Sequence, residues 1–150
     1  MDATLDLLGV FLLLAGFVIG LGAVTVIDLH GFLGRHSSYW TEATTRTHKV
    51  TKPLIWIGVA LCVAGGAVLY RHESFSGIPR AHALMALGLV LNGLFLSFSV
   101  SPFLLRREAE GKAGTPLPDA WQRKIFVSFL VSDGLWWASL FLFAAYLTRA

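Results

Sequence analysis

The stretch Ile125–Leu147, IFVSFLVSDGLWWASLFLFAAYL, decides the fold of this chain because it is apolar over a membrane-spanning length. A helix rises about 1.5 Å per residue, so this run can cross a hydrocarbon core of about 30 Å. Asp133 interrupts the run, with apolar residues on both sides. A charged side chain at this depth costs at least about 2.5–3.5 kcal/mol, and we expect a binding site or an ion pair to offset that cost.

Three further apolar runs, Leu7–Ile27, Pro53–Tyr70 and Ala83–Leu105, are also long enough to cross a bilayer once. They are continuous, whereas the strands of a membrane barrel alternate in polarity over about 10 residues. With 55% hydrophobic residues and a mean hydropathy of +0.67, the chain lacks the composition of a soluble domain. The sequence therefore predicts an all-α fold, an antiparallel bundle of four transmembrane helices that forms a single integral membrane domain. The expected spans are about 7–30, 53–70, 82–105 and 125–147.

Basic residues in the predicted loops set the expected orientation. The first and third loops carry most of them, namely Arg35, Arg46, Lys49, Lys52, Arg106, Arg107, Lys112, Arg123 and Lys124. The other side of the membrane would hold Arg71, Arg80 and Arg149. Cytoplasmic loops carry the excess of basic residues, so we expect both termini outside a bacterial cytoplasmic membrane. The pI near 9.4 then reflects contact with the lipid bilayer and not with nucleic acid.

Turn and proline positions predict where the helices begin and loosen. Gly34–Ser38 has the composition of a turn, and Tyr39–Lys52 is expected to form a short helix lying at the membrane interface. Pro53 suits the first turn of the second span, where its missing N–H costs nothing. Ser101 and Pro102 predict a kink or a loosened turn near the inner end of the third span.

Small residues recur at helical spacing and predict close helix packing: Gly16 with Gly20, then Gly58, Cys62 and Gly66, then Gly93, Ser97 and Ser101. Such faces allow helices to approach closely in lipid. Cys62 is the single cysteine, so a disulfide within the chain or a CxxC site is excluded and a packing role is expected. Trp136 and Trp137 lie in the middle of the last run and are also expected to pack, although an aromatic wall would suit a porphyrin.

Polar residues are concentrated in the cytoplasmic half of the predicted spans, and His82 is the exception in the outer half. Asp133 lies about 12 Å from the inner end of its helix. His48 and Lys52 are four residues apart, so they share one helix face where the second span begins. The sequence predicts one cytoplasm-facing polar site with Asp133 as its charged centre. Its candidate residues are Asp133, Asp28, His30, His48, Asn92 and Ser97.

Structural roles for these residues remain open. Asp28 could lie at the interface beside Arg35 or Lys52 if the first helix ends early. Asp133 could instead form an ion pair with a lysine of the first loop. Asn92 could serve an interhelical hydrogen bond, and the serines could bond to carbonyl groups of their own helices.

Two cofactors also stay open. Carboxylate and imidazole together suit a divalent metal, which Asp28, His30, His48 and Asp133 could bind, although no HxxxH or ExxH spacing supports it. A haem b bound by two histidines needs both at equal depth on facing helices. His30 with His48 is the pair that the predicted topology places on the same side.

Three features of the sequence match known membrane proteins in layout. These are a glycine-rich first helix, the basic stretch TTRTHK at 44–49, and the proline-started helix PLIWIG at 53–58 with a later Gly65-Gly66. The layout resembles small four-helix bacterial proteins of the copper-resistance-D-like type and the four-helix protoporphyrinogen oxidases that bind haem b. The oxidases typically carry a histidine early in the first helix with a lysine nearby, and Leu5–Gly16 has neither. The resemblance implies the four-helix layout and carries over no catalytic residue.

The leading functional hypothesis is a non-enzymatic, multi-pass membrane protein. It would be a small transporter, or an accessory subunit of a membrane complex, whose polar site binds an ion, a proton or a partner helix. Four helices enclose little volume, so we expect a homo-oligomer or a larger complex. The alternative is a haem-b-binding membrane redox protein that uses His30 and His48.

Overall fold

The computed structural model describes residues 2–148, and within them every regular element is helical. Helices α1 (Asp2–Leu33), α2 (Ser38–Leu69) and α5 (Asp119–Leu147) are long and continuous. The third stretch is composite, with α3 (Gly77–Phe95), a π-helical turn (Leu96–Val100) and α4 (Ser101–Ala109) following one another without a break. The structure thus has four helical stretches that are long and apolar enough to cross a membrane. The predicted all-α fold class is confirmed.

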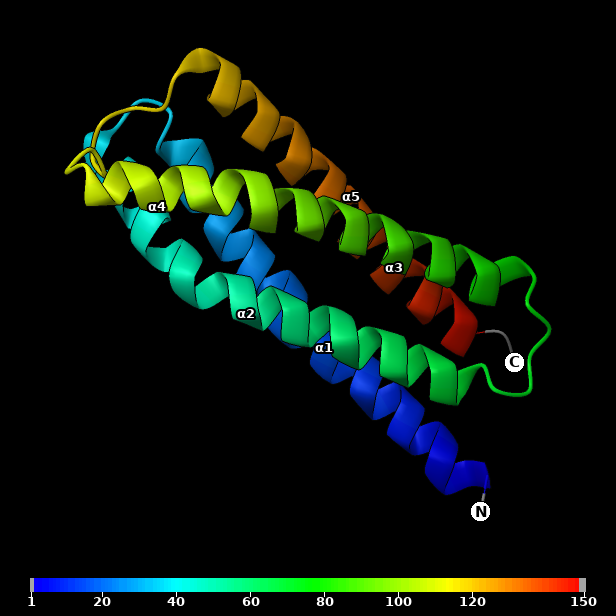
Figure 1. Cartoon of the computed structure of the whole chain (residues 1–150). Helices are drawn as coiled ribbons and strands as arrows, with labels where there is room; N and C mark the ends of the chain where they lie inside the picture. Colours follow the sequence, from blue (N-terminus) through cyan, green and yellow to red (C-terminus); the bar gives the residue numbers. More distant parts are fainter. Residues whose placement is uncertain (1, 149–150) are drawn as a thin grey trace.

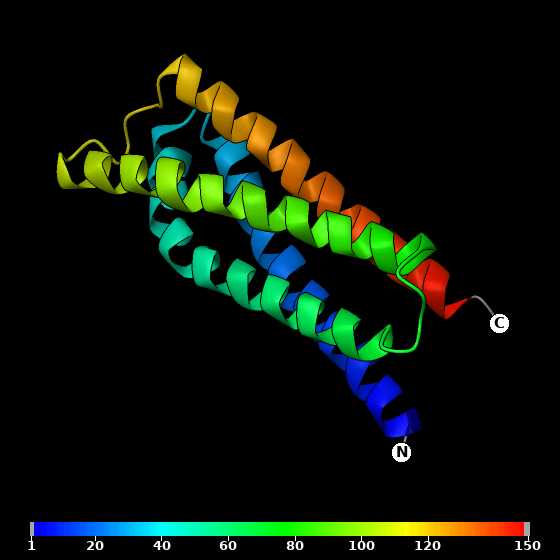
Figure 2. The same ribbon diagram turned by 45° about the vertical axis from the view of Figure 1, so that its right-hand side comes forward.

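Successive helical stretches lie side by side and run in opposite directions (Figure 1). The start of α1, the α2–α3 loop and the end of α5 lie at one end of the molecule, here called the termini end, as a second view also shows (Figure 2). Two contacts hold this end together: Arg71 Nη1 lies 2.6 Å from Asp6 Oδ1, and the Tyr146 hydroxyl donates to Glu73 Oε1 at 3.3 Å.

The opposite end contains the α1–α2 turn and the α4–α5 loop, and we call it the basic end. The lysines and arginines of both predicted basic loops lie on or beside these segments. Lys49 of α2 and Glu108 of α4 form an ion pair across it at 2.7 Å. Arg149, which the sequence assigns to the other side, lies outside the described residues.

The most extensive helix contact is between α1 and α2, and glycines make it close. A Cβ atom on Gly16 would lie 2.8 Å from the Gly58 carbonyl oxygen, and a Cβ on Gly58 would lie 2.6 Å from the Gly20 nitrogen. The predicted packing of these glycines is therefore confirmed. The expectation for Gly66 is wrong. A Cβ on Gly66 would meet only the ring of Tyr70, at 3.8 Å, and no atom of another helix. Gly65 takes its place, where a Cβ would lie 2.7 Å from a backbone nitrogen of α1.

Helix α2 differs from the prediction in being continuous. It begins after the N-cap Ser37 and runs through Pro53 to Leu69, so the separate interfacial helix at 39–52 is not formed. A proline inside a helix removes one N–H, which leaves the carbonyl of Lys49 without its helical partner. The neighbouring turn has an additional bond, since the Thr51 hydroxyl donates to the Thr47 carbonyl at 3.2 Å. One lost bond therefore does not end the helix.

The loosened turn expected at Ser101-Pro102 is present. Pro102 cannot donate to a carbonyl of the preceding turn, and the Ser101 N–H reaches back five residues to the Leu96 carbonyl. This π-helical turn directly precedes α4. Ser97 within this turn and Ser101 directly after it hydrogen-bond to Trp56 and His48 of α2.

The apolar core lies where α1, α2, α3 and α5 meet, with Trp136 and Phe143 as its most buried large side chains. Trp136 is 0% exposed and packs edge-on against Phe17, with ring centroids 6.2 Å apart. Its neighbour Trp137 is 57% exposed, so only one of the two tryptophans packs as expected. Consecutive helical residues point in different directions, and the outer one faces the surroundings.

Candidate functional site

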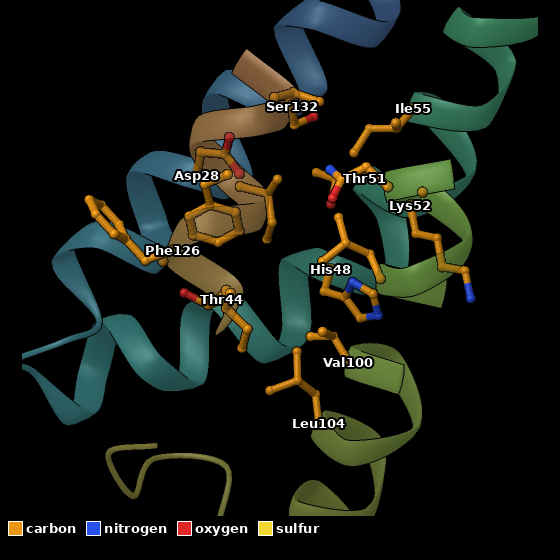
Figure 3. A pocket seen from close by; sticks show the side chains of 18 of the residues that line it. Asp28, Thr44, His48, Thr51, Lys52, Ile55, Val100, Leu104, Phe126 and Ser132 are labelled. Atoms are coloured by element: carbon orange, nitrogen blue, oxygen red, sulfur yellow. The ribbon is translucent and has the colours of Figure 1, made fainter. Parts of the chain in front are cut away.

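A cavity of about 120 Å³ lies between the helices in the half of the molecule next to the basic end. All four helical stretches contribute to its wall. Most of the lining is apolar, and the polar members are Asp28, Arg35, Thr41, Thr44, Thr45, His48, Thr51, Lys52, Trp56, Asn92, Ser97, Gln122 and Ser132. Figure 3 shows Asp28 and Phe126 on one side of the cavity and Thr51 and Ile55 on the other.

Helix α2 presents a polar face to the cavity. Thr41, Thr44, Thr45, His48 and Thr51 follow at spacings of three and four residues, which places them on one side of a helix. The hydroxyl protons of the four threonines are directed to backbone carbonyls, as in Thr45 to Thr41 at 3.1 Å. The hydroxyl oxygens can therefore still accept from, or coordinate, a group inside the cavity. His48 was among the predicted site residues, whereas the four threonines were not, although their spacing in the sequence could have revealed them.

Asp28 is the carboxylate of the cavity wall. It lies inside α1, which continues to Leu33, so the helix does not end early at this side chain. Its Oδ2 atom is buried and has no hydrogen-bond partner. Within residues 2–148, neither Arg35 nor Lys52 forms an ion pair with it.

Asp133 lies on α5 close enough to Asp28 for the two charges to interact. It is half-buried, and its Oδ1 atom is buried without a hydrogen-bond partner. The ion pair with a lysine of the first loop is not formed among the described residues. The cavity lining found within residues 2–148 includes Asp28 but not Asp133. The structure thus places Asp28 at the cavity, with Asp133 outside the lining but within electrostatic range of it.

His48 and Lys52 supply the basic side of the cavity and share one partner on α4. His48 Nε2 lies 2.8 Å from Ser101 Oγ, and Lys52 Nζ donates to the same oxygen at 3.5 Å. An ammonium group can only donate, so the Ser101 hydroxyl proton is free to point at His48 Nε2. In Figure 3 the Lys52 side chain extends away from Asp28.

Asn92 and Ser97 line the cavity but use their polar atoms to join helices. Asn92 Nδ2 donates to the Ser128 carbonyl at 3.1 Å, and Ser128 Oγ donates back to Asn92 Oδ1 at 2.6 Å. Ser97 Oγ accepts from Trp56 Nε1 at 3.2 Å. The interhelical hydrogen bond of Asn92 is confirmed, and we assign both residues to positioning the wall.

His30 is placed apart from the other candidates. Its ring packs against Trp40 with centroids 5.1 Å apart, and the cavity lining within residues 2–148 does not include it. The structure therefore does not bring His30 and His48 together at the cavity. Across the described part of the chain, no group of three or more His, Cys, Asp or Glu side chains could hold a metal ion.

Three cavity residues carry a buried polar atom without a hydrogen-bond partner: Asp28 Oδ2, Arg35 Nε and Trp136 Nε1. The Arg35 guanidinium is held between the rings of Phe32 and Phe126, 4.5 Å from each centroid. An unsatisfied polar group inside a bilayer costs several kcal/mol. This arrangement of one acceptor and two donors is suited to a polar or charged occupant.

The fold and the cavity define a class: a helical protein with four candidate membrane spans and a partly polar cavity between them. Comparisons with models of protein families, with curated proteins and with solved structures found no match for this chain. Function is therefore inferred from the geometry of the cavity.

Proposed function

We propose that this chain is a small, transporter-like multi-pass membrane protein that binds a proton or a small cation at Asp28. The observation that carries the proposal is the buried, unpartnered Oδ2 atom of Asp28 in a cavity between membrane-spanning helices. Residues with ionisable groups at membrane depth are costly and usually mark an ion or proton site. The same site would serve a transporter or an accessory subunit of a membrane complex.

Electrostatics supports a positively charged occupant. Asp133 is a second carboxyl within electrostatic range of Asp28, and two ionised carboxylates repel each other. No ion pair offsets this repulsion within residues 2–148. A proton or a cation bound at Asp28 removes one of the two negative charges and so relieves both desolvation and repulsion.

The opposite wall supplies ligands of the right kind for a hard cation. Hard cations prefer oxygen ligands, and α2 offers the hydroxyl oxygens of Thr44, Thr45 and Thr51. Lys52 and His48 lie at the same wall, toward the basic end.

The basic end, and with it the cavity, is proposed to face the cytoplasm. Support comes from the basic residues beside the α1–α2 turn and the α4–α5 loop, since such residues remain on the cytoplasmic side. Both termini would then lie outside a bacterial cytoplasmic membrane. A single bundle of four helices encloses little space, so we also propose a homo-oligomer or a larger membrane complex.

The haem-binding alternative has less support, because His30 lies outside the cavity lining and His48 bonds to Ser101. An absorption spectrum of protein produced with haem available separates the two proposals. We expect no Soret band that depends on either histidine. A Soret band lost in His48→Ala would favour the haem protein.

The test of the proposal compares Asp28→Asn with Asp119→Asn, an exposed aspartate in the first turn of α5. Purified protein in lipid nanodiscs is titrated with Na⁺ and with K⁺ by calorimetry, and its protonated carboxyl band is recorded by infrared spectroscopy. We expect a cation-binding signal or a carboxyl band that is lost in Asp28→Asn and kept in Asp119→Asn. If wild type shows neither signal, or Asp28→Asn keeps it, the proposal is wrong.

A further inference from the structure

Arg35 is a charged residue of the cavity wall that the proposed cation site does not use. It follows α1 directly, in the α1–α2 turn, and its side chain lines the cavity. Thr41 of α2 fixes this turn, because its buried hydroxyl lies 2.7 Å from the Gly34 carbonyl oxygen and 2.9 Å from that of Ser37. The backbone that carries Arg35 is therefore held in place.

The guanidinium group of Arg35 lies between two aromatic rings. Its Cζ atom is 4.5 Å from the ring centroid of Phe32 and 4.5 Å from that of Phe126. Phe126 belongs to α5, and Figure 3 shows its ring at the cavity wall. Contacts with ring faces leave the N–H donors of a guanidinium free to bind other groups. They also restrict the long side chain before any ligand arrives, so less entropy is lost on binding.

The donors of this group have no acceptor in the described part of the chain. The Nε atom of Arg35 is buried without a hydrogen-bond partner, and within residues 2–148 the side chain forms no ion pair. A guanidinium presents its donors in a planar fork that matches the two oxygens of a carboxylate. Arg35 thus has the geometry of a preformed anion-binding group.

The charges around the cavity also favour an anion. The charged residues of the lining are Asp28 from α1, Arg35 from the turn and Lys52 from α2, and His48 of α2 also faces it. Asp133 of α5 lies outside the lining, and none of these groups is ion-paired within residues 2–148. Once a proton or a cation neutralises Asp28, the lining keeps two positive charges. An anion at Arg35 balances one of them in surroundings where an unpaired charge is costly.

The rest of the wall determines the size and polarity of the ligand beyond its charged group. Apolar side chains from all four helical stretches line the cavity, among them Ile27, Ile55, Val100, Leu104 and Ile125. Figure 3 shows three of them, Ile55, Val100 and Leu104, at the cavity. An apolar cavity of about 150 Å³ holds benzene, so the volume of about 120 Å³ suits a smaller apolar group, of about four carbon atoms.

We propose that the cavity binds a short-chain monocarboxylate, whose carboxylate pairs with the Arg35 guanidinium and whose alkyl chain lies among the apolar side chains. A second carboxylate on the ligand would be buried in the apolar part without a partner, which limits the ligand to one. The proposal deepens the proposed function by naming an anionic substrate, and it rests on that function for the role in transport. The anion would move together with the proton or cation at Asp28, so that the pair carries no net charge.

The test titrates the full chain in phosphatidylcholine nanodiscs with sodium pentanoate by calorimetry, and protein-free nanodiscs are subtracted. Arg35→Gln should weaken binding at least about tenfold, because hydrogen bonds to a charged group are lost. Arg35→Lys keeps the charge without the planar fork and should recover only part of the affinity. Arg46→Gln is the control on α2, at a side chain that is 71% exposed, and should bind as wild type does.

A series of ligands tests the chemical class. Acetate lacks the alkyl chain, 1-pentanol lacks the charge, glutarate adds a second carboxylate and inorganic phosphate has no apolar part, so each should bind more weakly than pentanoate. Octanoate is longer than the cavity allows and should bind no more tightly than pentanoate. Affinity that still rises at octanoate would indicate the acyl chain of a lipid, and phosphate binding as tightly as pentanoate would indicate a general anion site. Either result overturns the proposal.

A second pair of variants tests the apolar part while Arg35 stays in place. Ile55→Phe enlarges a side chain at the cavity and should weaken the binding of pentanoate more than that of acetate. Ile57→Phe makes the same exchange at a side chain that is 48% exposed, and should leave both affinities unchanged. The proposal is overturned if wild type does not bind pentanoate, or if Arg35→Gln and Ile55→Phe both bind it as wild type does. Cation titration of Asp28→Asn is a separate measurement, so failure of either site is seen independently.

Discussion

At the scale of single residues, Asp28 and Asp133 show what a sequence does and does not determine. The sequence alone predicts that both carboxylates need a binding site or an ion pair to offset their cost in the membrane, because their depth follows from the length of the apolar runs. Which of them faces a cavity could not, since this depends on how α1 and α5 are rotated about their axes. The structure places Asp28 at the cavity, whereas Asp133 is outside the lining and interacts with Asp28 only electrostatically.

The polar wall opposite Asp28 leads to a prediction at one threonine. Thr51→Val keeps the shape of the side chain and removes the hydroxyl oxygen that lines the cavity. If a metal cation is the occupant, losing one ligand worth about 1 kcal/mol should weaken its binding roughly fivefold. Cation titration of the variant in nanodiscs measures this.

Thr115→Val, in the exposed α4–α5 loop, is the matched control and should bind as wild type does. Equal affinity in Thr51→Val and wild type would remove the threonine face of α2 from the site. If the occupant is a proton alone, neither variant changes the infrared carboxyl band.

At the scale of elements, the helices could be located from hydropathy but their ends could not. The structure extends the first span to Leu33, starts the second at Ser38 and ends the third at Ala109. Hydropathy marks the part of a helix that lies in hydrocarbon, whereas backbone hydrogen bonds continue into the polar interface. Pro53 shows a second limit, because a proline favours a helix start but is tolerated inside a helix when packing holds both sides.

The close contact between α1 and α2 leads to a prediction at Gly58. Gly58→Ala would place a Cβ 2.6 Å from the Gly20 nitrogen, so the two helices must move apart. Overpacking of this kind costs about 1–3 kcal/mol. We expect a corresponding loss in the free energy of unfolding, measured by titration with a denaturing detergent.

Gly22→Ala provides the control on α1, because a Cβ there meets no atom within 4 Å. The change should leave the free energy of unfolding within about 1 kcal/mol of wild type. Equal stability of the Gly58 and Gly22 variants would contradict the close approach of the two helices.

At the scale of the whole molecule, the loops group at two opposite ends of the bundle, as expected for a chain that crosses a membrane. The start of α1, the end of α5 and the α2–α3 loop share the termini end, and the basic loops share the other. This pairing could be predicted from an even number of spans. The position of the cavity could be predicted only in part. The sequence gives the depth of the polar residues in each of the four runs, but not which helix faces are in contact.

Orientation is therefore a prediction of its own. We expect a reporter that is active only outside the cytoplasm to be active when fused after Ala150, and inactive when inserted in the α4–α5 loop after Gly114. The physical reason is the retention of basic loops on the cytoplasmic side. The reverse pattern of activity would place the cavity at the outer side of the membrane.

The most direct test of the central claim is labelling of carboxyl groups by a hydrophobic carbodiimide, read by mass spectrometry of the intact protein in lipid. Such reagents react with protonated carboxyls within the apolar phase. The account predicts that Asp28 is labelled while exposed Asp119 is not, and that labelling falls when the pH is raised or a bound cation is added. An Asp28 that stays unlabelled at every pH and cation concentration, in folded protein, would contradict it.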